Sequence, residues 1–275
     1  MMGIKYLHSI TEIKKEHCYE TGGSKPLRVF CSDLNYYVCK YHKDAGFPFH
    51  LFNEYIAASF LQIWTLAVPE FAFVQINKTH TLQTAYPHYY FETIGFGSKY
   101  MGDFKEVDKL FIETPVIKKD NETGRNSFLR IALFDIWLSN EDRSFNNFNL
   151  LYNFKENIFV PIDHASCFNG NNLDKEPYLI THNESILSSP FLNRFFDRNL
   201  QTNSNNIRLS IIDEFKINVS RCHDELDNIL SETPLSWKAD TDFLRDRLFF
   251  LFSEQWTKAC LDYFTELFFL HLKSQ

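Results

Sequence analysis

The sequence predicts an α+β fold in two lobes, a small one over residues 1–93 and a larger one over residues 94–275. Short alternating segments and one apolar stripe at helical spacing predict an antiparallel sheet with one helix in the first lobe. Long helical patterns predict a mainly helical second lobe. The chain has 275 residues, 44% of them hydrophobic, so it is large enough to bury a sizeable core.

Two elements of the N-terminal lobe carry charged residues of interest. Residues 21–35 contain two glycines, a short apolar strand and a turn. The next segment, YYVCKYH over residues 36–42, alternates as a strand and carries Lys40. From Phe49 to Ala67 the pattern becomes helical, and Glu54 lies near its start. The apolar stripe of this helix is Phe52, Ile56, Phe60, Ile63 and Ala67.

Three aspartates are followed five positions later by an asparagine, and their context separates them. Asp135 and Asp213 lie in amphipathic helical patterns, and we expect Asp135 on the polar side of its helix. Asp142 comes after that helix, in NEDRSFNNFN over residues 140–149, a polar run typical of a loop. Loops held by a rigid scaffold are where catalytic groups concentrate. Asp142 and Asn147 are therefore the candidate functional pair.

A β-hairpin is predicted after this loop, with strands at residues 148–152 and 158–162, and it ends at Asp163. Asp142 would accept or orient the proton of an acceptor hydroxyl. Asn147 and Asp163 would supply oxygen ligands to magnesium bridging the phosphates of ATP. The pattern therefore predicts ATP- and magnesium-dependent phosphoryl transfer. The alternative is that these residues only form turns and cap a strand end.

The N-terminal lobe offers a matching phosphate site. A lysine on the sheet and a glutamate on the packed helix can form an ion pair that aims the ammonium at the α and β phosphates, and Lys40 and Glu54 are the candidates. The alternative is a surface lysine and a first-turn glutamate. Gly22, Gly23 and Ser24 would bring backbone N–H groups close to phosphate, or form an ordinary flexible loop. Self-phosphorylation at Ser24 is a further hypothesis, motivated by its place in this glycine loop. The added negative charge would repel ATP.

With these residues in this order, the chain resembles HipA-like serine/threonine kinases, bacterial proteins often found as toxins of toxin–antitoxin systems. The strongest local matches are DRSFNNF, residues 142–148, and IDHASCF, residues 162–168. This catalytic segment is also distantly similar to that of phosphatidylinositol kinases. The resemblance covers about residues 21–168. It implies a two-lobed protein-kinase-like fold, transfer from ATP to a Ser or Thr hydroxyl of a protein, and a separate antitoxin or accessory chain as a partner.

The resemblance also implies a role for each site residue: phosphate contact for Lys40, pairing with that lysine for Glu54, acid/base catalysis for Asp142, and magnesium binding for Asn147 and Asp163. Two departures from the family pattern stand out. Ser144 stands where many relatives have histidine. Asp163 is followed by His164 and Ala165, whereas protein kinases have Phe and Gly at these positions. We therefore do not expect the segment after Asp163 to behave like the activation segment of protein kinases.

Composition argues against several other classes of protein. The formal charge is −7 and there is no long basic run, so the electrostatic footprint of a nucleic-acid-binding protein is missing. The richest apolar runs, LFFLF and LFFL, are far shorter than the roughly 18 residues that span a bilayer. The N-terminus lacks the pattern of a secretion signal, and the six cysteines form no CxxC pair. We therefore expect a cytoplasmic protein that binds neither nucleic acid nor membrane.

The C-terminal lobe is expected to contain long helices at residues 209–230 and 243–272, after a break at residues 199–206. Two rival functions stay open. The adjacent His223 and Asp224 would suit an HD-type metal hydrolase, although no paired-histidine motif accompanies them. The other rival is a kinase-like module that binds ATP but acts through protein interaction without efficient transfer.

Overall fold

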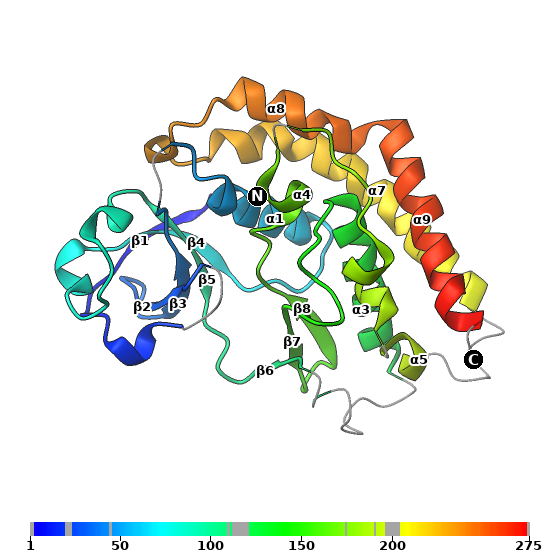
Figure 1. Ribbon diagram of the computed structural model, residues 1–275, viewed down its shortest axis with the longest axis horizontal. Helices are drawn as coiled ribbons and strands as arrows, with labels where there is room; N and C mark the ends of the chain where they lie inside the picture. Colours follow the sequence, from blue (N-terminus) through cyan, green and yellow to red (C-terminus); the bar gives the residue numbers. More distant parts are fainter. Residues whose placement is uncertain are drawn as a thin grey trace.

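The computed structural model describes residues 3–19, 24–43, 46–108, 111, 121–173, 175–189, 191–195 and 204–273. Its N-terminal region is rich in β-strands and its C-terminal part is mainly helical, as Figure 1 shows. This arrangement confirms the mixture of sheet and helix predicted from the sequence, with most strands early in the chain and the long helices late.

The N-terminal region is built on a five-stranded sheet of β1 (Lys5–His8), β2 (Leu27–Phe30), β3 (Tyr36–Lys40), β4 (Phe71–Gln75) and β5 (Gly95–Lys99). The strand order is β1-β4-β5-β3-β2. All neighbours are antiparallel except β1 and β4, which are parallel, so the prediction of an antiparallel sheet is wrong at this edge. The middle strand β5 begins just beyond the lobe boundary expected at residue 93, and that boundary stays a prediction.

One helix, α1 (Phe49–Ile63), covers part of one face of this sheet. Phe73 and Phe96 on that face join the same apolar cluster as the side chains of α1. The opposite face carries a second cluster, which includes Val29 and Val74. Lys40 is paired with Phe96, so it points toward α1 and not into the second cluster.

The helix α1 ends earlier than its apolar pattern. The pattern continues to Ala67, but the structure ends the helix at Ile63. Thr65 takes a left-handed backbone with φ of 54°, and the N–H groups of Thr65 and Leu66 both return to carbonyls of the last helical turn at 3.0 Å. These two bonds form a Schellman motif, which usually places glycine at the left-handed residue. Because threonine stands there instead, the sequence contains no obvious stop signal.

A second, three-stranded sheet begins the C-terminal part, in the order β6 (Lys105–Glu106), β7 (Leu150–Asn153) and β8 (Ile158–Pro161). β7 and β8 form the predicted antiparallel hairpin. The helix before this hairpin, α3 (Glu122–Trp137), is capped by Asn121, whose side chain accepts a hydrogen bond from the N–H of Gly124. Because α3 packs against β8, the loop between helix and hairpin is held at both ends.

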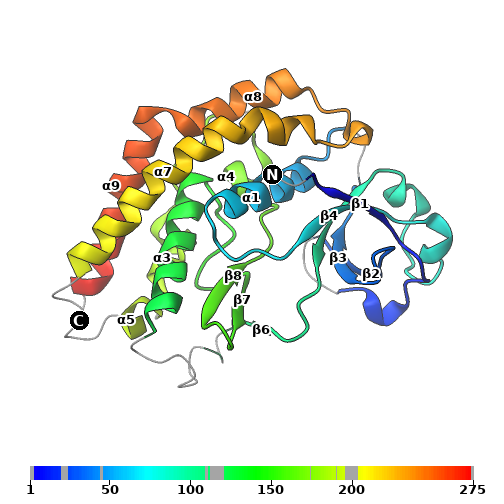
Figure 2. The same cartoon turned by 180° about the vertical axis from the view of Figure 1, so that it is seen from behind.

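Long helices enclose the other side of α3, as the two views in Figures 1 and 2 show. They are α7 (Ser204–Ser231) and α9 (Glu254–Lys273), and the shorter α8 (Thr241–Phe249) packs against α7. The short helices are α4 (Cys167–Asn171) and α5 (Phe191–Phe195). Single 3₁₀ turns are η1 (Lys15–His17), η2 (Lys78–Thr81), η3 (His88–Phe91), η4 (His182–Glu184), η5 (Ile186–Ser188), η6 (Leu235–Trp237) and η7 (Phe250–Phe252).

The single long helix predicted at residues 243–272 is wrong, because the chain breaks between α8 and α9. Ser253 adopts an extended backbone with φ of −64° and ψ of 144°. Its hydroxyl accepts a hydrogen bond from the N–H of Trp256 at 3.2 Å, so Ser253 caps the new helix α9. The break predicted at residues 199–206 lies largely outside the described residues.

One apolar cluster joins the sheet to the helices. It contains side chains from β4, β5, α1, α3, α7 and α9. Where the chain is described, no helix combines the length and apolar character needed to cross a membrane.

Candidate active site

Lys40, Glu54 and Asp163 form an ionic cluster where the sheet, α1 and the β7–β8 hairpin meet. The ammonium of Lys40 donates to a carboxylate oxygen of Glu54 and to Oδ1 of Asp163, the latter at 2.5 Å. Lys40 and Glu54 are both buried, and Glu54 lies beyond the first turn of α1, so the alternative of a surface lysine and a first-turn glutamate is wrong. The side chain of Asp163 is 37% exposed, and a ligand can therefore reach the cluster from this side.

The three charges change one another's pKa. Burial alone would lower the pKa of Lys40, but the carboxylates of Glu54 and Asp163 raise it above its ordinary value. Burial raises the pKa of Glu54, although the charge of Lys40 opposes this. The pKa of Asp163 is lowered despite burial, because Lys40 and Arg143 favour its ionised form. Lys40 and Asp163 are therefore both charged at neutral pH.

Backbone geometry holds Lys40 and Asp163 in place. A Cβ atom on Gly95 of β5 would lie 2.5 Å from the carbonyl oxygen of Lys40, so the pairing of these strands requires glycine there. Asp163 adopts a left-handed backbone with φ of 58°, which Asp tolerates better than most residues. The sharp turn at Asp163 follows directly after the hairpin.

The segment after Asp163 is fastened to α1. The N–H of His164 donates to Oε1 of Glu54 at 3.0 Å. The residue before Glu54 also takes part, because Nδ2 of Asn53 donates to the carbonyls of Ala165 and Cys167 at 2.9 and 3.1 Å. Two neighbouring residues of α1 thus fix the chain on the far side of Asp163.

The predicted pair Asp142 and Asn147 is in contact. The Asp142 carboxylate accepts a hydrogen bond from Nδ2 of Asn147 at 3.0 Å and from Nδ2 of Asn149 at 3.2 Å. Two backbone hydrogen bonds between Ser144 and Asn147, at 2.9 and 3.2 Å, close the loop between them. Asn147 uses its amide nitrogen toward Asp142, so this contact does not consume its carbonyl oxygen.

Arg143 joins the two groups of residues. Its side chain is fully buried. The guanidinium donates to the carbonyl of Ile162 at 3.0 Å and contacts Nε2 of His164 at 2.7 Å. Because Asp142 precedes this arginine, and Ile162 and His164 flank Asp163, one side chain sets the spacing between the loop and Asp163.

Asp135 is the buried counterion of this arginine. Nε of Arg143 donates to Oδ2 of Asp135 at 2.8 Å, and Nδ2 of Asn140 donates to Oδ1 at 2.8 Å. Asp135 is only 2% exposed, so the expectation that it lies on the polar side of its helix is wrong. Burial raises the pKa of Asp135 to about 6, against the effect of Arg143. Helical periodicity cannot reveal a charge that is buried with its partner.

The remaining predicted residues lie elsewhere. Gly22 and Gly23 fall outside the described residues, while Ser24 is half-buried in a bend before β2. His223 and Asp224 lie on α7 with their nearest ring nitrogen and carboxylate oxygen 3.9 Å apart, and both side chains are exposed. In the part of the chain that is described, no three His, Cys, Asp or Glu side chains are grouped to hold a metal ion. The metal-hydrolase alternative thus receives no support there.

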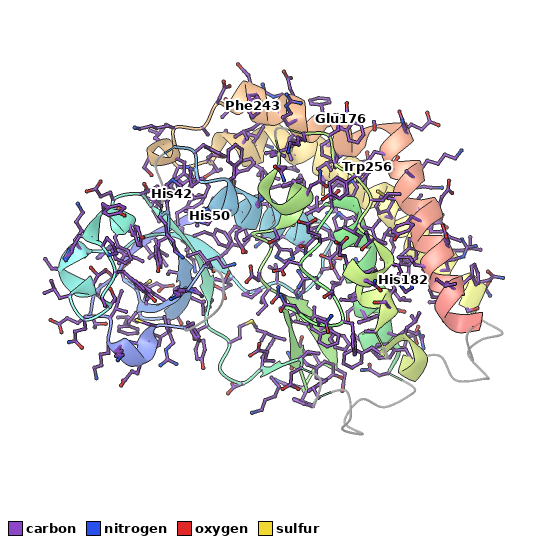
Figure 3. All side chains as sticks on the ribbon, in the orientation of Figure 1. His42, His50, Glu176, His182, Phe243 and Trp256 are labelled. Carbon is purple, nitrogen blue, oxygen red and sulfur yellow. The ribbon has the colours of Figure 1, made fainter. Side chains whose placement is uncertain are left out.

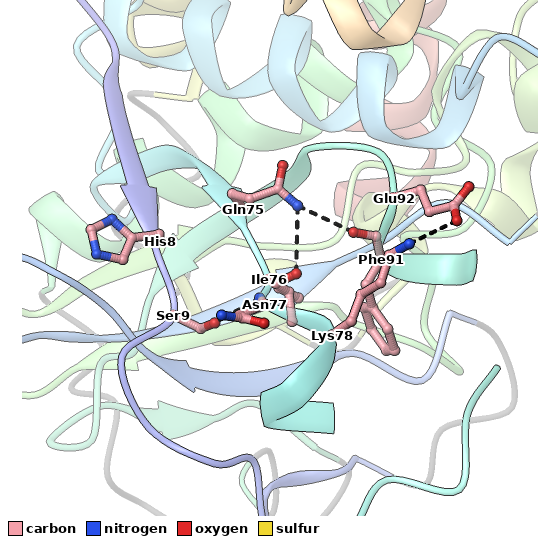
Figure 4. A pocket seen from close by; sticks show the side chains of 8 residues that line it. All are labelled: His8, Ser9, Gln75, Ile76, Asn77, Lys78, Phe91 and Glu92. Atoms are coloured by element: carbon pink, nitrogen blue, oxygen red, sulfur yellow. Dashed lines mark hydrogen bonds and ion pairs between the residues drawn. The ribbon is translucent and has the colours of Figure 1, made fainter. Parts of the chain in front are cut away.

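A separate pocket of about 410 Å³ lies where β1 and β4 end (Figure 4). Lys78 pairs with Glu92 at 2.8 Å, and Gln75 donates to the carbonyls of Ile76 and Phe91. Its lysine, glutamate and glutamine are thus already engaged. The pocket shares no residue with the Lys40 cluster, which remains the candidate active site.

Comparison with known proteins identifies the family. The family model for HipA-like kinases matches residues 10–254, so the chain belongs to the HipA-like kinase family. Among solved structures, the crystal structure of a Helicobacter pylori proinflammatory kinase, CtkA, is similar to this chain. It has a TM-score of 0.52 and 15% sequence identity, over 96% of this chain and 99% of that chain. At this identity the likeness shows a shared fold alone. A search of curated proteins found no significant match.

Sequence reasoning missed three residues that hold the site together, namely Arg143, Asp135 and Asn149. One signal was available for two of them. Asp135 and Asp142 are both followed five positions later by an asparagine, and Arg143 stands between the two asparagines. Treating the two pairs as one unit around the arginine, and not as rivals, would have suggested a shared network.

Proposed function

We propose that this protein is an ATP- and magnesium-dependent kinase that phosphorylates a Ser or Thr hydroxyl of a protein. The observation that carries the proposal is the connection through Arg143 between the loop of Asp142 and the segment of Asp163, beside the Lys40–Glu54 pair. Membership of the HipA-like kinase family and the similarity to a kinase fold support this class of reaction. A two-lobed kinase arrangement, with the nucleotide between the lobes, is part of the same proposal.

The residues present fit a nucleotide with magnesium. The Lys40 ammonium would contact the α and β phosphates while Glu54 holds it in position. Asp163 and Asn147 would each contribute an oxygen ligand to magnesium, since the carboxylate of Asp163 is partly exposed and the amide oxygen of Asn147 is not used by Asp142. Bound magnesium would neutralise charge on the transferred phosphoryl group.

Asp142 would handle the proton of the acceptor. Two carboxamide N–H groups, from Asn147 and Asn149, hold its carboxylate in place. A carboxylate held in this way can orient the hydroxyl of the acceptor and accept its proton as the phosphoryl group is transferred.

The identity of the acceptor is proposed from the family. Membership of the HipA-like kinase family suggests a protein substrate. The preference for serine or threonine is proposed from the resemblance of the catalytic segment. A partner chain of the antitoxin type has the same kind of support, whereas self-phosphorylation at Ser24 rests on the place of this serine next to the two glycines. Both stay predictions.

The test is the variant Asp142→Ala. Transfer of labelled phosphate from ATP to protein should fall by about 10²-fold or more, because a positioned general base typically contributes 10²–10⁴-fold. Asp213→Ala is the matched control, since Asp213 has the same spacing to an asparagine but lies exposed on α7. Equal incorporation by the Asp142→Ala variant and the wild type would refute the assignment.

An ATP-binding module without efficient transfer is the second candidate. Ser144 favours it, because many relatives have histidine at this position of the loop. Calorimetric binding of ATP with magnesium, together with no labelled phosphate in any protein of a cell extract, would decide for the module and against the kinase.

A further inference from the structure

The face of the five-stranded sheet that carries Lys40 is covered over only part of its area. In antiparallel strands, residues directly opposite each other point to the same face. Lys40 is opposite Phe96, while Val38 is opposite both Ser98 and Arg28. Phe96 is buried under α1, whereas Arg28, Val38 and Ser98 are half-exposed. An open strip, made of these last three residues, therefore continues along the sheet from Lys40.

Arg28 is held at this strip by two aromatic rings. Its guanidinium carbon lies 5.6 Å from the ring centre of Tyr36 and 5.2 Å from that of Tyr100. Its Nε is buried and, among the described residues, finds no hydrogen-bond partner. The strip thus contains an oriented planar cation whose Nε–H group is not used in a hydrogen bond within the part of the chain that is described.

We propose that Arg28 contacts the base of the bound nucleotide and makes affinity depend on that base. The inference rests on the proposed function, since Lys40 marks the phosphate end of the site. Val38 lies two residues from Lys40, which is about 7 Å along the strand, and Arg28 is on the neighbouring strand about 5 Å further. These distances are within reach of a nucleotide whose phosphates lie at Lys40. Its base would extend toward the strip, because α1 covers the sheet on the other side of Lys40.

The chemistry of arginine suits this contact. The planar guanidinium stacks on aromatic faces, which the ammonium of lysine cannot do in the same way. Stacking of a nucleobase on an aromatic side chain is typically worth about 5- to 150-fold in affinity, and arginine adds a cation–π contribution of its own. The rings of Tyr36 and Tyr100 reduce the freedom of Arg28 before the nucleotide binds.

Calorimetric titration of the full chain tests the proposal with two ligands. One is ATP with magnesium, and the other is inorganic tripolyphosphate with magnesium, which carries phosphates without a base. Arg28→Ala and Arg28→Lys should each raise the Kd for ATP about tenfold and change the Kd for tripolyphosphate by less than about twofold. Arg247→Ala is the matched control, because Arg247 also lies over an aromatic ring, 5.3 Å from the centre of Phe243, but on α8.

Each other outcome would overturn the proposal. An Arg28→Lys variant that binds ATP like the wild type would mean that the charge matters and not the planar group. Equal weakening of ATP and tripolyphosphate would place Arg28 on the phosphates. If ATP binds the wild type and both variants equally, the proposed function survives and the role of Arg28 fails. If the wild type binds neither ligand, both fail. Circular dichroism melting curves confirm that the variants are folded.

Discussion

Arg143 is fully buried, although the residues around it look like a polar surface loop. A buried guanidinium is costly unless its N–H groups find acceptors. Here the acceptors are Asp135, the ring of His164 and the backbone carbonyls of Ile162, Phe148 and Asn149. Burial, together with the charge of Arg143, lowers the pKa of His164 well below its ordinary value, so the ring stays neutral and can accept. These acceptors come from different elements, which only the folded chain brings together.

His50 makes the stability of the protein depend on pH. It lies at the start of α1 beside His42, as Figure 3 shows. Burial lowers the pKa of His50 to about 4, and the nearby His42 and Lys40 add to this effect. In the unfolded chain a histidine has its ordinary pKa of about 6.5. Below this pH the unfolded chain binds the proton first, so this stabilisation is lost as the pH falls from about 6.5 to about 4.

The variant His50→Gln isolates this effect. Glutamine can still donate a hydrogen bond to the carbonyl of Tyr41, as Nε2 of His50 does at 3.1 Å, but it does not titrate. In urea unfolding, the stability of the wild type relative to the variant should fall by about 1.4 kcal/mol for each pH unit between about pH 6.5 and about pH 4, and level off below. Parallel pH profiles for the two proteins would contradict the shifted pKa.

At the scale of elements, helix ends were harder to predict than helix faces. The apolar stripe of α1 was read correctly up to Ile63, because burial against the sheet imposes the helical period. The end of α1 depends on the left-handed backbone of Thr65, for which threonine is an unusual residue. The break before α9 did have a local signal in Ser253, a good N-cap residue directly after the apolar run at residues 248–252.

The strain at Thr65 can be measured. Thr65→Gly should be more stable than Thr65→Ala by about 1 kcal/mol, because glycine adopts the left-handed backbone without a Cβ clash. Both substitutions remove the exposed side chain, so their difference reports the backbone alone. Denaturant midpoints that agree between the two variants would show that residue 65 is not left-handed in solution.

At the scale of the whole molecule, one apolar core passes from the sheet into the helices. Trp237, in the turn between α7 and α8, packs against Tyr55 and Phe73 with ring centres 6.4 and 5.5 Å apart. Its indole N–H donates to the carbonyl of Ile94 at 2.7 Å. The C-terminal helices are therefore fastened directly to α1 and the sheet, and this contact contributes to the position of α1 and of Glu54.

Trp237→Ala should lower the free energy of unfolding by about 3–5 kcal/mol, because it leaves a cavity at the contact between the two regions. Leu235→Ala, two residues away and 96% exposed, should change it by no more than about 0.5 kcal/mol. Both values come from chemical denaturation followed by circular dichroism. A loss for Trp237→Ala as small as that for Leu235→Ala would show that the two regions are not joined through this residue.

The local sequence pattern was sufficient to predict the strand of Lys40, the helix of Glu54, the hairpin before Asp163 and the pairing of Asp142 with Asn147. Each depends on residues close together in sequence, where side-chain period and turn chemistry act directly. The roles of these residues in catalysis stay predictions. The parallel pairing of β1 with β4 and the burial of Asp135 and Arg143 were decided by the tertiary structure alone. Both depend on partners that are distant in sequence or come from several elements. The residues next to a position in the chain do not determine which elements will pack over it.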